Sequence, residues 1–210
     1  MKGQKSTNWI PNWPIIESES TSKIKLPGEF NFTFAGNLGK VQNLRNVLAG
    51  FKSVSNKFPN AWFNLIGDGS AMEELKLFVD SENILNVNFE GRKPLELMPD
   101  YFQASDVLII SLIDAPIYEI MIPSKFQTYL SYQKPIFAIM KGEVPAMVSQ
   151  FNIGGSSDPD NIVDIQNGFE KFINSSEKEL RYMGSESKKL LNNYFLRERN
   201  IKSLTKITFE

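Results

Sequence analysis

The chain has 210 residues, of which 41% are hydrophobic and 22% charged, so it is long enough for one large globular domain or two small ones. Its formal net charge of -1 lacks the basic excess that a general nucleic-acid binder needs, and we expect no nucleic-acid partner. The absence of Cys and His excludes thiol nucleophiles, disulfides, imidazole bases and the commonest zinc and iron sites.

The chain opens with a polar segment that contains several prolines. Residues 10–14 read Ile-Pro-Asn-Trp-Pro, and a Ser- and Glu-rich run follows at 17–22. No apolar stretch of a signal peptide occurs there, and the apolar run at 107–110 is far short of the roughly 20 residues that span a bilayer. We therefore expect a cytoplasmic protein in which residues 1–29 form a linker and residues 30–210 form the domain.

From residue 30 onwards, strand and helix patterns alternate. Apolar runs at 30–35, 62–66, 87–89, 107–111 and 135–140 are each followed by apolar residues at helical spacing. Such alternation predicts an α/β fold, a doubly wound, Rossmann-like parallel sheet of about six strands with helices on both faces. Beyond residue 159 the pattern is almost wholly helical, which predicts a helical C-terminal tail.

A glycine-rich turn follows the first predicted strand. Residues 34–39 read Phe-Ala-Gly-Asn-Leu-Gly, and Lys40 comes next. In an open parallel sheet, ligands bind beyond the carboxyl ends of the strands, where Gly36 and Gly39 would let the backbone approach a diphosphate. A tight strand-to-helix turn with no ligand explains the same glycines, so this motif alone does not decide between the two.

Further motifs occur in a recognisable order. Leu-Ile-Gly-Asp-Gly stands at 65–69, Val-Asn-Phe-Glu-Gly at 87–91, Tyr-Phe-Gln-Ala-Ser-Asp-Val at 101–107, Pro-Ser-Lys at 123–125 and Lys-Pro-Ile at 134–136. Together with the first glycine loop, they resemble the C-terminal, donor-binding domain of a GT-B fold glycosyltransferase. The resemblance is to retaining family four, or glycosyltransferase group 1, in its bacterial surface-polysaccharide branch.

The resemblance implies that this domain binds a nucleotide sugar, such as a UDP- or GDP-sugar, and uses no cofactor or metal ion. By position, the residues that would hold the donor diphosphate are Gly36, Asn37, Leu38, Gly39, Lys40, Ser124 and Lys125. The residues that would border the nucleobase or ribose are Asp68, Arg92, Lys93 and Thr128. Lys125 is the principal candidate, because it combines a charge with a helix N-terminus.

Two features depart from the family pattern. The family's Arg and Lys near the first glycine loop correspond here to Asn37 and Gln42, so Lys40 or Lys125 must supply the positive charge. The family's pair of glutamates falls on Ile120 and Thr128. We assign the catalytic role near the sugar to the adjacent Glu119, whereas a threonine cannot replace a carboxylate in a bidentate contact with the ribose hydroxyls.

The resemblance also implies partners. Members of the family place the acceptor site in an N-terminal half, so we expect this chain to be inactive alone and to need that domain or a partner subunit. We expect retaining, metal-independent transfer to a glycan or lipid-linked acceptor, with peripheral association at the inner face of the cytoplasmic membrane. Open alternatives are a non-catalytic nucleotide-sugar-binding subunit or fragment, half of a sugar-nucleotide epimerase, and a receiver-like domain.

Overall fold

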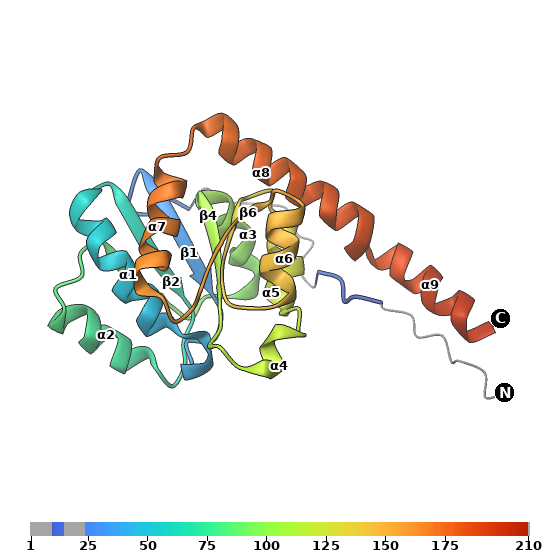
Figure 1. The fold of residues 1–210 in the computed structure, drawn as a ribbon, viewed down its shortest axis with the longest axis horizontal. Helices are drawn as coiled ribbons and strands as arrows, with labels where there is room; N and C mark the ends of the chain where they lie inside the picture. Colours follow the sequence, from blue (N-terminus) through green and yellow to red (C-terminus); the bar gives the residue numbers. More distant parts are fainter. Residues whose placement is uncertain (1–9, 15–23, 210) are drawn as a thin grey trace.

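The computed structural model describes residues 10–14 and 24–209, with side chains up to residue 205. It contains a fully parallel, six-stranded sheet in the order β3-β2-β1-β4-β5-β6 (Figure 1). The strands are β1 (Phe30–Ala35), β2 (Ala61–Ile66), β3 (Val87–Gly91), β4 (Val107–Ser111), β5 (Ile136–Ile139) and β6 (Gly154–Ser157). The predicted doubly wound α/β fold is confirmed.

Helices cover both faces of this sheet (Figure 1). The helices are α1 (Leu44–Lys57), α2 (Met72–Ser81), α3 (Met98–Ala104), α4 (Pro116–Glu119), α5 (Ser124–Leu130), α6 (Glu143–Gln150), α7 (Ile162–Ile173), α8 (Glu177–Leu190) and α9 (Arg197–Phe209). Short 3-10 turns, η1 (Lys40–Gln42) and η2 (Leu95–Leu97), precede α1 and α3, and a π-helical turn, η3 (Leu191–Phe195), joins α8 to α9.

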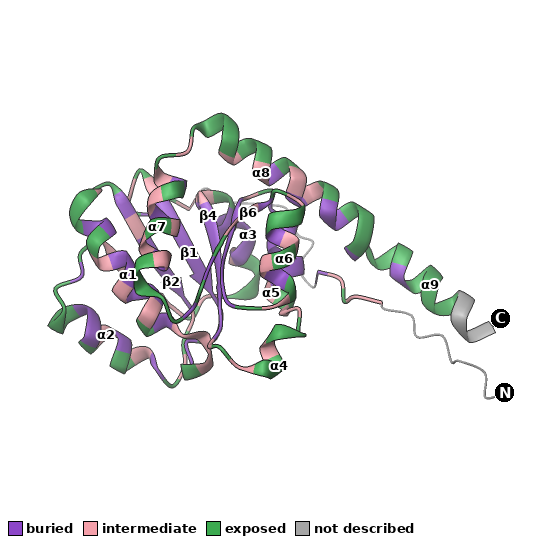
Figure 2. Cartoon of the chain, viewed as in Figure 1, coloured by how far each residue is buried: buried purple, intermediate pink, exposed green. Residues whose placement is uncertain are grey.

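Two hydrophobic cores lie on opposite faces of the sheet, because successive strand side chains point to opposite sides. Along β4, Val107 and Ile109 enter the core beneath α1, α2 and α7, whereas Leu108 and Ile110 enter the core beneath α3, α5 and α6. Figure 2 shows buried strands at the centre of the molecule, with the exposed residues on the outer faces of the helices and in the loops. This burial on both faces explains why β4 and β5 read as continuous apolar runs.

The C-terminal tail is helical, as predicted. Ser176 and Glu179 form a reciprocal capping box at the start of α8, which fixes where that helix begins. The following helix, α9, extends away from the body of the domain (Figure 1). The Asn200 amide donates to the Pro11 carbonyl at 2.9 Å, so the N-terminal segment is bound to α9 at this point. The rest of the proposed linker, at 1–9 and 15–23, lies outside the described residues.

Candidate functional site

Three neighbouring strands end at glycines on one edge of the sheet. Gly36 follows β1, Gly67 follows β2 and Gly91 ends β3, and their φ angles are +134°, +141° and +69°. The first two angles are open without strain only to glycine, and the third lies in the left-handed region that glycine adopts most readily. The strand order also changes direction here, because β2 follows β1 on one side while β4 lies on the other. The topological switch point, where open α/β sheets bind their ligands, therefore lies between β1 and β4, next to the Gly36 loop.

The first two glycine loops are bonded directly to each other. The Gly36 N–H donates to the Ile66 carbonyl at 2.8 Å, and the Leu38 N–H donates to the Asp68 carbonyl at 2.9 Å. A Cβ on Gly67 would stand 1.9 Å from the Gly36 carbonyl oxygen, so the two backbones leave no room for a side chain. The loops form one rigid floor.

This bonding also limits which groups of the first loop face a ligand. The Leu38 side chain is fully buried in the core and its N–H is already bonded. The Gly39 N–H is not free to donate to a ligand, because it already donates to the Gln42 side chain at 3.0 Å. Gly36 and Asn37 are exposed, so these two residues are the part of the loop that a ligand can reach.

A pocket of about 710 Å³ opens over this floor. Its lining residues are Gly36, Asn37, Ile66, Gly67, Asp68, Arg92, Lys93, Pro94, Leu95 and Met98. The structure thus brings together the glycine loop, Asp68 and the Arg92-Lys93 pair, which lie far apart in the sequence. Pro94, Leu95 and Met98 were not among the predicted site residues. The sequence could have indicated them, because they come directly after the carboxyl end of the third strand.

Lys125 lies beside this pocket, on the first turn of α5. Its Nζ sits 4.3 Å from the centre of the Phe34 ring, and a Cβ on Gly36 would stand 2.7 Å from that Nζ. In the described part of the chain no carboxylate lies within ion-pair distance of it. Burial lowers the Lys125 pKa to about 8. An ammonium that has lost water and gained no counter-charge favours an incoming anion.

Lys93 is held quite differently. Its Nζ lies 2.9 Å from a carboxylate oxygen of Glu90, which also accepts hydrogen bonds from Asn88 and Tyr101. Burial raises the pKa of Glu90, but these donors outweigh it and hold the pKa below its ordinary value. The hydrogen bond to Glu90 raises the Lys93 pKa. Lys93 therefore brings little free positive charge to the pocket, and its ion pair fixes the loop that carries Arg92.

Ser124 and Thr128 belong to the helix that carries Lys125. Ser124 is exposed at the first position of α5. Thr128 is 9% exposed, and its hydroxyl donates to the Ser124 carbonyl at 3.1 Å. This hydroxyl is committed to the helix backbone, and Thr128 does not line the pocket. With only seven residues, α5 has a weak dipole, so the Lys125 charge is the main attraction for an anion here.

Glu119 and Lys40 stand apart from the pocket. Glu119 is exposed at the end of α4, and its backbone packs on Gly142 just beyond β5. It lies at the same edge of the sheet but does not line the pocket. Lys40 is exposed, and with Gly39 it lines a separate hollow of about 280 Å³ between the starts of α1 and α2. Of the two lysines proposed to supply charge, only Lys125 contacts a residue of the main pocket.

Fold and site together define a doubly wound domain with a pocket at the carboxyl ends of its strands, bordering the switch point. Residues 17–190 match the model of the family described as glycosyl transferases group 1, and the chain belongs to this family. A curated relative, the probable glycosyltransferase WbjE of Pseudomonas aeruginosa, is 27% identical over 170 residues. That alignment covers 76% of this chain and 42% of the relative, so the chain spans less than half of the relative's length.

Solved structures share the fold. The C-terminal domain of the group 1 glycosyl transferase LpcC from Francisella tularensis aligns with a TM-score of 0.68 at 14% identity, over 82% of this chain and 89% of that one. HepE of Anabaena in complex with UDP aligns with a TM-score of 0.72 at 14% identity, over 85% of this chain and 48% of that one. A TarM mutant of S. aureus, in complex with fondaparinux, α-GlcNAc-glycerol and UDP, aligns with a TM-score of 0.71 at 12% identity. The alignment covers 91% of this chain and 38% of that one.

The family match decides between the classes of protein that the sequence left open. A receiver-like domain and an epimerase half receive no support, whereas a group 1 glycosyltransferase domain does.

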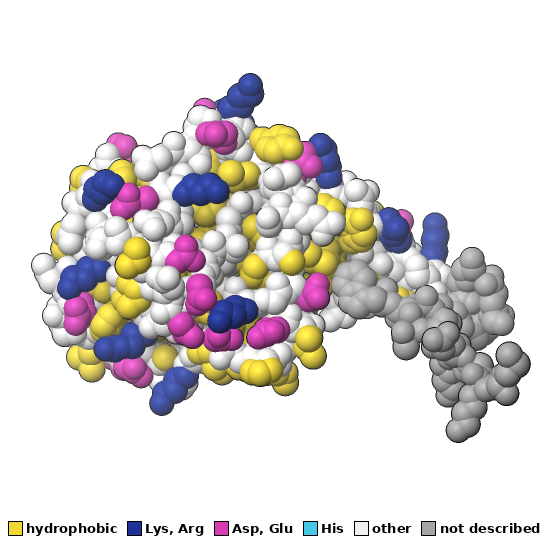
Figure 3. All heavy atoms as spheres, viewed as in Figure 1, with side chains coloured by type: hydrophobic (Ala, Val, Ile, Leu, Met, Phe, Trp, Pro, Cys, Tyr) yellow, Lys and Arg dark blue, Asp and Glu magenta, His cyan; other side chains and the backbone are white. Residues whose placement is uncertain are grey.

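No helix in the described ranges is both long and apolar enough to cross a membrane. On the face drawn in Figure 3, basic and acidic side chains are interspersed and form no basic patch of the kind that holds nucleic acid.

Proposed function

We propose that this chain is the donor-binding half of a glycosyltransferase and that it holds a nucleotide sugar at the switch point. The observation that carries the proposal is the Lys125 ammonium, which is half-buried, lies against Gly36 and has no counter-charge among the described residues. The adjoining volume of about 710 Å³ is suited to a ligand of nucleotide size.

The pocket suggests how the donor would lie. The diphosphate would occupy the end near Lys125, Gly36 and Asn37, where charge and exposed backbone meet. The nucleoside would extend over Asp68 towards Pro94 and Leu95, which offer an exposed apolar surface for a base. HepE and TarM were solved with UDP, which supports a uridine nucleotide as the first probe.

The chemistry we propose is metal-independent transfer with retention and without a cofactor. As the bond to the sugar breaks, negative charge grows on the departing diphosphate. A lysine that is already desolvated stabilises that charge more than an exposed lysine would. We retain Glu119 as the proposed contact near the sugar, because α4 ends at the same edge of the sheet.

The acceptor would come from elsewhere. The relative WbjE is much longer than this chain, which supports an N-terminal acceptor domain or a partner subunit that completes the cleft. We therefore expect the 210-residue chain to bind the donor but not to transfer sugar. The membrane part of the proposal, peripheral contact with the inner face of the cytoplasmic membrane, depends on a lipid-linked acceptor.

The test is a calorimetric titration of the chain with UDP, GDP, ADP and the UDP- and GDP-sugars, with Lys125→Ala measured beside it. We expect one nucleobase to bind selectively and the binding to weaken in Lys125→Ala. Equal weak binding of all nucleotides, unchanged in the variant, would refute the donor site. Selective binding without turnover after an acceptor domain is supplied would instead identify a non-catalytic nucleotide-sugar-binding subunit.

A further inference from the structure

The two central strands separate where the pocket opens. β1 pairs with β2 as far as Ala35, but its pairing with β4 ends at Thr33. Neighbouring residues of a strand direct their backbone groups to opposite sides. The Gly36 N–H bonds to β2, so the N–H and carbonyl of Ala35 face the β4 side, where the ladder has stopped.

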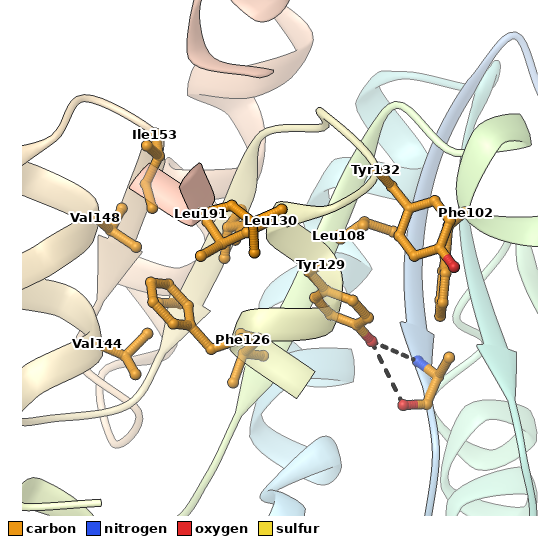
Figure 4. Close-up of a cluster of buried hydrophobic side chains, with 14 of the residues drawn as sticks. Phe102, Leu108, Phe126, Tyr129, Leu130, Tyr132, Val144, Val148, Ile153 and Leu191 are labelled. Atoms are coloured by element: carbon orange, nitrogen blue, oxygen red, sulfur yellow. Dashed lines mark hydrogen bonds between the residues drawn. The ribbon is translucent and has the colours of Figure 1, made fainter. Parts of the chain in front are cut away.

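A tyrosine hydroxyl takes the place of the missing strand partner. The Ala35 N–H donates to the Tyr129 hydroxyl at 3.1 Å, and this hydroxyl donates to the Ala35 carbonyl at 3.4 Å (Figure 4). Tyr129 is 1% exposed, and its ring packs edge-on against Phe102. A buried backbone pair that would otherwise lack partners is thus satisfied by one side chain of α5.

Tyr129 and Lys125 are four residues apart on α5, so both side chains lie on one face of the helix. These two side chains contact consecutive residues at the end of β1 and the start of its loop. Lys125 lies over the Phe34 ring and against Gly36, and Tyr129 bonds to Ala35 between them. The Tyr129 hydrogen bonds thus tie α5 to the end of β1 one helical turn away from Lys125.

We propose that Tyr129 is a positioning residue, whose hydroxyl bridges α5 and the end of β1 and thereby holds the Lys125 ammonium over Gly36, where the donor diphosphate would bind. The role in donor binding rests on the proposed function, whereas the placement of Lys125 does not. No charged side chain contributes to the Lys125 pKa shift, which burial alone causes. The position of α5 thus controls how much water reaches the ammonium.

The neighbouring Tyr132 provides a matched control. Its ring also packs against Phe102, with centroids 4.9 Å apart compared with 5.2 Å for Tyr129. It is 6% exposed, but its hydroxyl has no hydrogen-bond partner among the residues that the structure describes. Figure 4 shows the two hydroxyls, of which only that of Tyr129 bonds to β1. Replacing either tyrosine with Phe removes one buried oxygen, but only Tyr129→Phe breaks the bridge.

The experiment compares Tyr129→Phe and Tyr132→Phe in the full chain by two readouts. Lysine-selective NMR follows the titration of Lys125, assigned with Lys125→Met, and calorimetry gives the affinity for UDP. In Tyr129→Phe we expect the Lys125 pKa to rise from about 8 towards its ordinary value, because water reaches the ammonium. We expect UDP affinity to fall about three- to tenfold, the range for losing a neutral hydrogen bond. Tyr132→Phe should leave both readouts unchanged.

The Lys125→Met background shows whether Tyr129 acts through the lysine. There, Tyr129→Phe should cause no further loss of UDP affinity. An unchanged Lys125 titration in folded Tyr129→Phe, or equal effects of both tyrosine variants, would overturn the proposal. If wild type does not bind UDP at all, the donor-site assignment fails, while the NMR comparison still decides the placement of Lys125.

A measurement on the wild-type chain covers the case in which Tyr129→Phe does not fold. The Ala35 amide has no strand partner, so its hydrogen exchange depends on the tyrosine hydroxyl. We expect it to exchange as slowly as its neighbours in β1, whose amides pair with adjacent strands. Rapid exchange of Ala35 within a protected strand would show that the bridge is absent and would overturn the proposal.

Discussion

The two lysines at the pocket are held in opposite ways. Lys93 is paired with a carboxylate that three donors stabilise, and the hydrogen bond to Glu90 raises its pKa. Lys125 has an aromatic ring beneath it and no counter-charge within the part of the chain that the structure describes, and burial lowers its pKa to about 8. The difference shows that charge alone does not identify a ligand-binding residue. An unpaired charge that has lost its water is the one that gains most from an anion.

The two ends of the pocket also differ in how tightly the backbone packs, and substituting their glycines should give the largest effect. A Cβ on Gly67 would stand 1.9 Å from the Gly36 carbonyl oxygen, whereas a Cβ on Gly91 would meet nothing within 4 Å. We expect Gly67→Ala to lower the free energy of unfolding by more than about 3 kcal/mol, through strain and a backbone clash. Gly91→Ala, the control, should cost about 1 kcal/mol for its positive φ alone. Urea unfolding measures the free energy of unfolding of both variants. Equal losses would contradict the close packing of the first two glycine loops.

The contrast between the lysines predicts unequal effects on binding. Lys125→Met should weaken UDP binding about 10- to 100-fold, because hydrogen bonds to charged groups contribute about 1.5–3 kcal/mol. Lys93→Met should weaken it less than about threefold, because the Lys93 charge is already neutralised by Glu90. Calorimetry of the two variants provides the comparison. Equal losses would mean that the Glu90 ion pair opens to release Lys93 to the ligand.

The lowered pKa of Lys125 predicts how binding depends on pH. Below pH 8 the ammonium is charged and attracts the diphosphate, and above pH 8 the free protein increasingly carries a neutral amine. UDP affinity should therefore fall about tenfold between about pH 7 and 9, whereas an ordinary lysine with a pKa of about 10.4 would keep it constant. In Lys125→Met the fall should disappear. A fall of the same size in that variant would assign the titration to another group.

The smallest effect should come from Thr128. Its hydroxyl bonds to the Ser124 carbonyl within α5, so Thr128→Val should change UDP affinity less than about twofold. Thr128→Ser keeps the hydroxyl and is the control. A loss above fivefold in Thr128→Val alone would mean that the hydroxyl turns to the ribose when the nucleotide binds.

Most of the fold followed from the sequence, because buried parallel strands have a distinctive apolar pattern. The strand Val107–Ser111 was predicted to the residue, whereas Gly154–Ser157 had no such pattern. Its sequence is Gly-Gly-Ser-Ser, which has low intrinsic preference for a strand. Pairing with β5 imposes the conformation, and a Cβ on Gly154 would come within 1.9 Å of the Ile136 carbonyl oxygen. Close backbone approach, rather than apolar burial, defines this strand.

The candidate site was likewise predictable from the sequence only in part. The meeting of Gly36, Asp68 and Arg92 followed from topology, because the carboxyl ends of parallel strands share one edge. The ring beneath Lys125 and the tyrosine bridge to Ala35 did not follow, because they depend on the directions of individual side chains. The commitment of the Thr128 hydroxyl to its own helix was equally hidden from a one-dimensional pattern.

The most direct test of the central claim is a map of backbone amide shifts in ¹⁵N-labelled chain titrated with UDP. The account predicts that the shifts concentrate at Gly36, Asn37, Asp68 and Arg92, on one edge of the sheet. It predicts none at Asp106 and Gln133, which line a second pocket, of about 390 Å³, at the opposite edge. Shifts confined to that second pocket, or none at saturating UDP, would contradict a donor site at the switch point.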